Sequence, residues 1–122
     1  MERKNVVREK AFAFAVRIVK LSQRLIKDRE YVISKQIAKS GTSIGANIEE
    51  ADGAYTRRDF AAKISISYKE ARETHYWLRL LYATQQMTKE EFDSLQKDCD
   101  ELCKLLFAIL KTVRGITRSR HS

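Results

Sequence analysis

The sequence predicts an all-α protein, an up-down-up-down four-helix bundle, and three observations support this. Proline is absent and glycine occurs only 4 times in 122 residues, whereas β-sandwiches and barrels need turn residues at every corner. Hydrophobic residues make up 43% of the chain, enough for the core of a single domain. Apolar residues recur at alternating steps of three and four, the period of an amphipathic helix.

The first predicted helix covers residues 5–27. Its core stripe keeps every member on one face, through Val7, Ala11, Phe14, Ile18, Leu21 and Leu25. The pattern fails after Ile26 and resumes in a new phase at Ile33, which predicts a second helix over residues 32–52. Gly53 stands where a left-handed residue would end that helix.

The third predicted helix covers residues 57–83 and the fourth residues 89–114, closing at Gly115. No Gly or Pro separates them, but one unbroken helix of about 58 residues would be roughly 87 Å long and could not bury its stripe within one chain. Thr88 opens a capping box, which favours a turn before it. The tail over residues 116–122 is expected to be frayed.

Composition restricts the function classes. Lys and Arg total 24 against 16 Asp and Glu, a net charge of +8. No run of about 18 apolar residues could span a membrane, and the charged N-terminus does not resemble a signal peptide. Cys99 and Cys103 are expected to be buried thiols, because with only His75 and His121 a zinc site is hard to assemble. A cytoplasmic protein is the default interpretation.

The second predicted helix carries a run of small residues. Gly41 and Gly45 are four apart, a spacing that lets a neighbouring backbone come close, and Ser43 belongs to the same motif. A phosphate-binding glycine loop is the alternative, but it needs a preceding strand and a following Lys-Ser/Thr, which are missing. Asn47 occupies a core position and is expected to hydrogen-bond across the bundle and fix its register.

Carboxylates on the second and third helices raise the question of a di-metal site. Such a site needs Glu-x-x-His on two helices, but Glu70 is followed by Glu73 and Glu50 by Gly53. Structural carboxylates are therefore expected, with no metal and no cofactor. His75 is the one histidine inside the predicted fold, and it offers a poor basis for an enzyme.

Two basic stripes each repeat every seven residues. Single-sign stripes suit a polyanion such as RNA or DNA better than pairing within the chain, and a solvated face with counterions is the alternative. The stripes are Lys10, Arg17 and Arg24 on the first helix and Lys97, Lys104 and Lys111 on the fourth.

A second apolar stripe on the first helix exceeds what one bundle can bury. It comprises Phe12, Val19 and Ile26, with Val16 farther from the core. Trp77 likewise lies off the main stripe of its helix. It would either pack in a second apolar seam or stack on a nucleic-acid base. Self-association is the simplest way to cover this surface.

A set of motifs on the second and third predicted helices carries a family resemblance. They are residues 35–40 (KQIAKS), 42–51 (TSIGANIEEA), 59–60 (DF), 69–74 (KEARET) and 76–78 (YWL). Through these motifs the chain resembles the four-helix bundle family called S23, which includes proteins encoded in intervening sequences of bacterial 23S rRNA genes. The resemblance implies a homopentameric ring and no catalytic activity. In a relative, the accessory variability protein of diversity-generating retroelements, the basic pentamer binds nucleic acid and a reverse transcriptase.

These observations favour a small, basic, non-enzymatic oligomer that binds RNA or DNA through its backbone, as an accessory to an rRNA intervening sequence or a retroelement. The rival is a protein-binding scaffold with incidental positive charge. A metal-dependent bundle enzyme comes third. No membrane partner is expected.

Overall fold

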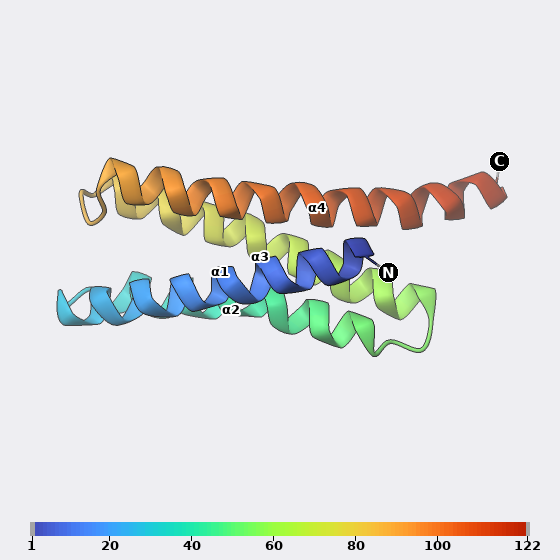
Figure 1. The fold of residues 1–122 in the computed structure, drawn as a ribbon, viewed down its shortest axis with the longest axis horizontal. Helices are drawn as coiled ribbons and strands as arrows, with labels where there is room; N and C mark the ends of the chain where they lie inside the picture. The colour runs from blue at the N-terminus through green and yellow to red at the C-terminus, as the bar shows by residue number, and fades with distance from the viewer. Residues whose placement is uncertain (1, 122) are drawn as a thin grey trace.

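The structure, a computed structural model, describes residues 2–121, with side chains described over residues 6–115. Its helices are α1 (Glu2–Lys27), α2 (Tyr31–Asp52), α3 (Arg57–Ala83) and α4 (Lys89–His121). Consecutive helices lie antiparallel and side by side, and α4 packs against both α3 and α1 (Figure 1). The predicted all-α bundle is confirmed. None of these helices combines the length and apolarity that crossing a membrane requires.

The heptad stripes meet in the core. Each residue of the core stripe of α1, from Val7 to Leu25, is at most 4% exposed. The core-facing apolar residues of α3 are buried from Ile64 to Leu81 and those of α4 from Leu95 to Ile109, whereas Phe60, Phe92 and Val113 are half-buried. Burying one such large apolar side chain contributes about 1.5–3 kcal/mol relative to leaving it in water. The helical period therefore determines which residues hold the bundle together.

The turn between α1 and α2 contains neither Gly nor Pro. Arg29 adopts a left-handed conformation, with φ 64°. The backbone N–H of Glu30 donates to the Leu25 carbonyl at 2.8 Å and that of Arg29 to the Ile26 carbonyl at 3.0 Å, the Schellman pattern that usually contains glycine. The same pair of bonds ends α3, where Gln85 has φ 62°. In both turns, therefore, a residue other than glycine adopts the left-handed conformation.

Side-chain caps begin three of the helices. Glu30 caps α2 and Thr56 caps α3, while Thr88 Oγ1 accepts from the Glu91 N–H at 3.2 Å and caps α4. This is one of the two bonds of the predicted capping box, and the Glu91 carboxylate pairs with Arg24 instead. The expectation of a left-handed Gly53 is wrong, because its φ is −92°. An ordinary φ suffices there because the loop to α3 runs on for several residues before the next helix begins.

Helix α4 is longer than predicted. It continues through Gly115 to His121, so the end predicted at residue 114 is wrong. A glycine inside a helix costs only about 1 kcal/mol against alanine and does not by itself stop the helix. The side chains of the predicted frayed tail, residues 116–122, lie outside the described residues.

Candidate functional site

The small residues of α2 bring its backbone against α1. A Cβ built on Gly41 would lie 2.7 Å from Cγ2 of Ile18, a fully buried β-branched side chain that has little freedom to move. A Cβ on Gly45 would lie 3.6 Å from the Cβ of Ala11, an ordinary contact. The close packing is therefore tightest at Gly41, one helical turn before Gly45.

Asn47 does not bond across the bundle, and the expectation that it would is wrong. Its Nδ2 donates to the Ser43 carbonyl at 2.8 Å within α2, because a half-buried amide at the edge of the core reaches a carbonyl one turn back. Ser43 in turn donates to the Lys39 carbonyl at 2.7 Å. Buried hydroxyls make the cross-helix bonds instead, as where Thr74 Oγ1 donates to Ser40 Oγ at 2.8 Å.

The glutamates of α2 and α3 each have their own neighbour. Glu50 pairs with Lys63 at 2.7 Å, and Glu73 accepts from Trp77 Nε1 at 3.1 Å. Partial burial, and then the nearby charge of Glu73, raise the pKa of Glu70. Among the described residues, no three His, Cys, Asp or Glu side chains gather as a metal site would require.

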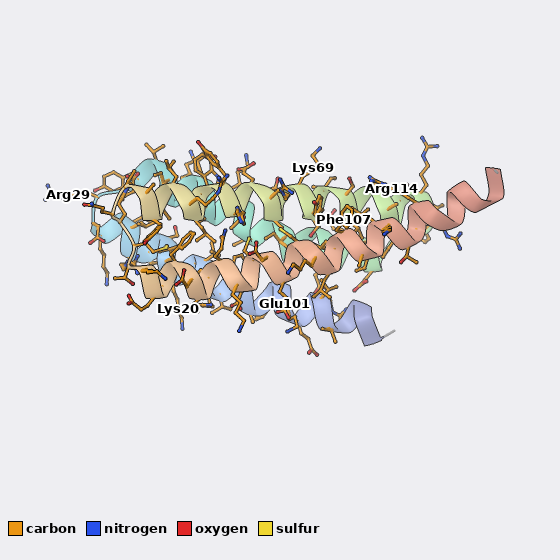
Figure 2. All side chains as sticks on the ribbon, turned by 90° about the horizontal axis from the view of Figure 1, so that it is seen from above. Lys20, Arg29, Lys69, Glu101, Phe107 and Arg114 are labelled. Atoms are coloured by element: carbon orange, nitrogen blue, oxygen red, sulfur yellow. The ribbon has the colours of Figure 1, made fainter. Side chains whose placement is uncertain are left out.

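The basic stripe of α1 faces α4 and is paired there. The expectation that this stripe suits a polyanion better than pairing within the chain is wrong, because flanking positions of adjacent helices meet and carry opposite charges. Figure 2 places Glu101 on the side of α4 nearer α1. The pairs are Lys10–Glu101 at 3.1 Å, Arg17–Asp98 at 2.7 Å and Arg24–Glu91 at 2.5 Å.

The basic stripe of α4 behaves differently. Lys97, Lys104 and Lys111 lie opposite the buried stripe of this helix and are exposed. None of the three has an ion-pair partner among the described residues. The helix therefore presents three lysine ammonium groups to solvent.

Phe107 is a surface residue that the sequence analysis did not single out. Its side chain is 52% exposed, and its ring lies 5.9 Å from that of Tyr68 on α3. Lys104 precedes it by three residues and Lys111 follows it by four, so all three share one side of α4. The sequence contained one signal for this surface residue: a large apolar side chain that lies off the core stripe of its helix and between two lysines.

The apolar stripe of α1 is exposed to solvent in the single chain. Phe12 is 71% exposed, Ile26 49%, Val19 41% and Val16 40%. Trp77, by contrast, is half-buried and packs against the core. The four α1 residues thus lie exposed on the outer side of this helix, and they are defined here as the α1 stripe.

The polar and sulfur groups between α3 and α4 are engaged with one another. The Gln96 amide is hydrogen-bonded to the His75 ring, and Asp100 lies 3.3 Å from the same ring nitrogen. Burial lowers the pKa of His75, and the charge of Asp100 partly opposes this. A hydrogen bond to Cys103 and burial raise the pKa of the Cys99 thiol, which keeps it protonated and unreactive.

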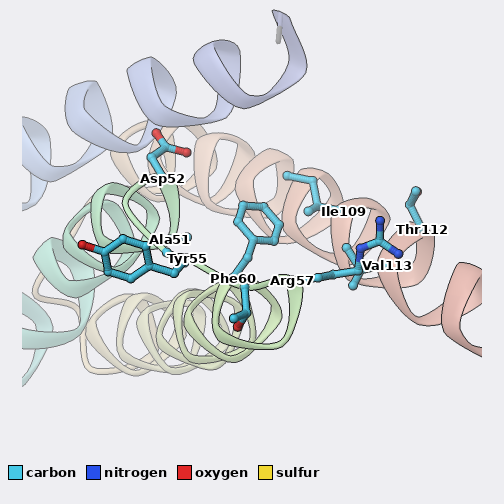
Figure 3. Close-up of a pocket in the computed structure, with 10 residues that line it drawn as sticks. Ala51, Asp52, Tyr55, Arg57, Phe60, Ile109, Thr112 and Val113 are labelled. Atoms are coloured by element: carbon cyan, nitrogen blue, oxygen red, sulfur yellow. The ribbon is translucent and has the colours of Figure 1, made fainter.

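A recess of about 540 Å³ opens where the α2–α3 loop meets α4 (Figure 3). Phe60 and Ile109 line it with apolar surface, and Arg57 contributes one guanidinium. Its carboxylate, Asp52, is paired with Arg8 at 3.1 Å. The lining residues therefore hold no nucleophile beside a free base, which is what hydrolytic or transfer chemistry needs.

Comparison with known proteins agrees with the fold and the motifs. The family model described as 23S rRNA-intervening sequence protein matches residues 3–108. The chain belongs to this family. An S23-family protein of unknown function from Bacteroides thetaiotaomicron, solved by crystallography, is 51% identical with a TM-score of 0.87, and the match covers 89% of this chain and 98% of that chain. No curated protein matches significantly.

Proposed function

We propose that this S23-family protein is a small, non-enzymatic oligomer that binds nucleic acid through phosphate contacts. The observation that carries the proposal is the exposed line of Lys97, Lys104 and Lys111 on α4, which has no ion-pair partner among the described residues. Seven residues of α-helix rise roughly 10 Å, so the three lysines follow one straight track. Together with a net charge of +8, such a track attracts a polyanion.

The family description makes structured RNA the first ligand to test, because it refers to an intervening sequence of 23S rRNA. In that setting the protein would act as an accessory that binds transcript or gene without altering it covalently. The retroelement relative noted above binds nucleic acid, so duplex DNA is the second ligand to test. A protein-binding scaffold with no nucleic-acid role is the alternative.

A salt titration tests this proposal. Binding to a structured RNA and to duplex DNA is measured by fluorescence anisotropy between about 50 and about 200 mM salt, where phosphate contacts give a steep loss of affinity. The double variant Lys104→Glu, Lys111→Glu should weaken binding to unrelated sequences alike and flatten the salt slope. Its matched control is Lys20→Glu, Lys27→Glu, which makes the same charge change at exposed positions of α1.

The outcomes separate the two candidate functions. Undetectable binding to both ligands at low salt would overturn the nucleic-acid proposal and leave the scaffold. If the α4 variant and its α1 control lose equal affinity, binding depends on the net charge of the protein and not on the lysines of α4.

A further inference from the structure

Acidic residues are absent from two antiparallel segments that pack together in the half of the bundle near the α2–α3 loop. Residues 60–69 of α3 and residues 102–115 of α4 contain no Asp or Glu. The contact between Tyr68 and Phe107 joins the two segments. Of the described cations on them, Lys63 is paired with Glu50, whereas the other cations have no ion-pair partner among the described residues.

The exposed ring of Phe107, on α4, lies at the contact between these segments. Tyr68 packs against one side of it, and Arg72 donates to the Tyr68 hydroxyl at 3.4 Å, which places a guanidinium on the same border. Figure 2 shows Phe107 and Arg114 along the border of α3 and α4, and Lys69 at the edge of α3 away from α4. The Phe107 surface is defined as Arg72, Lys104, Phe107, Lys111 and Arg114.

The other half of α4 is electrostatically different. Lys97 and Lys104 line a shallow hollow together with Asp93, Asp100 and Glu101, so these carboxylates offset part of the charge of both lysines. A polyanion that approaches α4 is therefore drawn toward the part of the Phe107 surface beyond this hollow, because no acidic residue follows Glu101 in the sequence of α4. A second copy of the chain carries the same net charge of +8, so the cations around Phe107 favour a polyanion over another subunit.

We infer that the Phe107 surface binds single-stranded nucleic acid, with one base stacked on the Phe107 ring and the adjoining phosphates on Lys104, Lys111 and Arg72 of α3. This inference rests on the proposed function and specifies the ligand and the place. An aromatic ring stacks on any base, so the site has little sequence preference. A duplex keeps its bases inside its own stack, and only its phosphates could contact this surface.

The test compares a single-stranded oligonucleotide with a duplex of the same length, using the full-length protein. Phe107→Leu keeps an apolar side chain but removes the ring. It should weaken single-strand binding by about fivefold or more, the lower end of what one stacked base contributes, and leave duplex binding within about twofold. Phe107→Tyr should retain single-strand affinity. Tyr55→Leu, which removes a fully exposed ring from the α2–α3 loop, is the matched control.

Each outcome bears on a separate claim. If Phe107→Leu leaves single-strand binding unchanged, or weakens both ligands equally, the stacking inference is wrong while phosphate binding stands. If the unaltered protein binds neither ligand at low salt, the proposed function fails as well. If Phe107→Leu lowers the mass of the assembly in light scattering, the ring belongs to a subunit contact and the inference is overturned.

Discussion

An added Cβ atom has less room at Gly41 of α2 than at Gly45. Gly45→Ala should stabilise the fold by up to about 1 kcal/mol, because alanine favours a helix over glycine and its methyl would meet only ordinary contacts. Gly41→Ala would press against Ile18, and overpacking costs about 1–3 kcal/mol. Urea denaturation of both variants should rank Gly45→Ala above Gly41→Ala, and equal stabilities would contradict the packing described for α1 and α2.

Gln85 occupies a left-handed position that glycine adopts without strain. The conformation costs a residue with a Cβ about 1–2 kcal/mol, and glycine would remove this cost. The greater freedom of glycine in the unfolded chain offsets about 0.5–1 kcal/mol of that stabilisation. Gln85→Gly should therefore raise the melting temperature. Gln23→Gly, at an exposed site within α1, should lower it by the usual helix penalty. A loss of stability in Gln85→Gly would refute the turn geometry.

His75 should make the fold sensitive to mild acid. Burial lowers its pKa in the folded state below the ordinary value of 6.5, so the unfolded chain binds a proton more readily. The stabilising contribution of neutral His75 is present above pH 6.5 and falls as the pH drops toward the lower folded value. Its ring faces Asp100 and Gln96 of α4 and the guanidinium groups of Arg72 and Arg79.

The measurement is the free energy of unfolding at pH 7.5 and pH 5.5, for the unaltered protein and for His75→Gln. Glutamine keeps a hydrogen-bonding side chain that does not titrate. We expect the unaltered protein to lose more stability across this interval than the variant. An equal loss in both would assign the pH dependence to carboxylates instead.

At the scale of helices, the ion pairs between α1 and α4 link the first helix to the last. Each is half-exposed, and such pairs contribute only about 0–1 kcal/mol apiece. Arg17→Glu would set a carboxylate beside Asp98 and should destabilise the fold, and adding Asp98→Arg should restore most of the loss. A double-mutant cycle in low and high salt measures this coupling, and a coupling of zero at low salt would contradict the pairing.

The helices themselves could be predicted because each must bury one face, and the period of apolar residues locates that face. The ion-pair partners of the charged residues could not be predicted from the sequence, because the pairing of Arg17 with Asp98 depends on which helices become neighbours. The break between the first two helices was predicted, but the left-handed conformation of Arg29 was not, since no residue preference indicates a left-handed arginine. Phe107 was missed because its significance comes from α3 lying beside it.

At the scale of the whole molecule, two surfaces lie on different helices. The α1 stripe is apolar, and the Phe107 surface on α3 and α4 is basic. If copies associate through the α1 stripe, each copy still presents its Phe107 surface to a ligand. Binding sites repeated around one assembly act together, so weak contacts at each copy would add up to a much tighter complex.

Self-association through the α1 stripe is the last prediction. Light scattering at micromolar concentration should give a mass several times the 14.2 kDa of one chain, with five subunits implied by the family resemblance. Phe12→Lys combined with Val19→Lys should reduce that mass, because two buried charges without partners disfavour an apolar interface. Tyr55→Lys, at a fully exposed loop residue, should leave it unchanged. A monomer at high concentration would refute the prediction, and an unchanged mass in the double variant would move the interface away from α1.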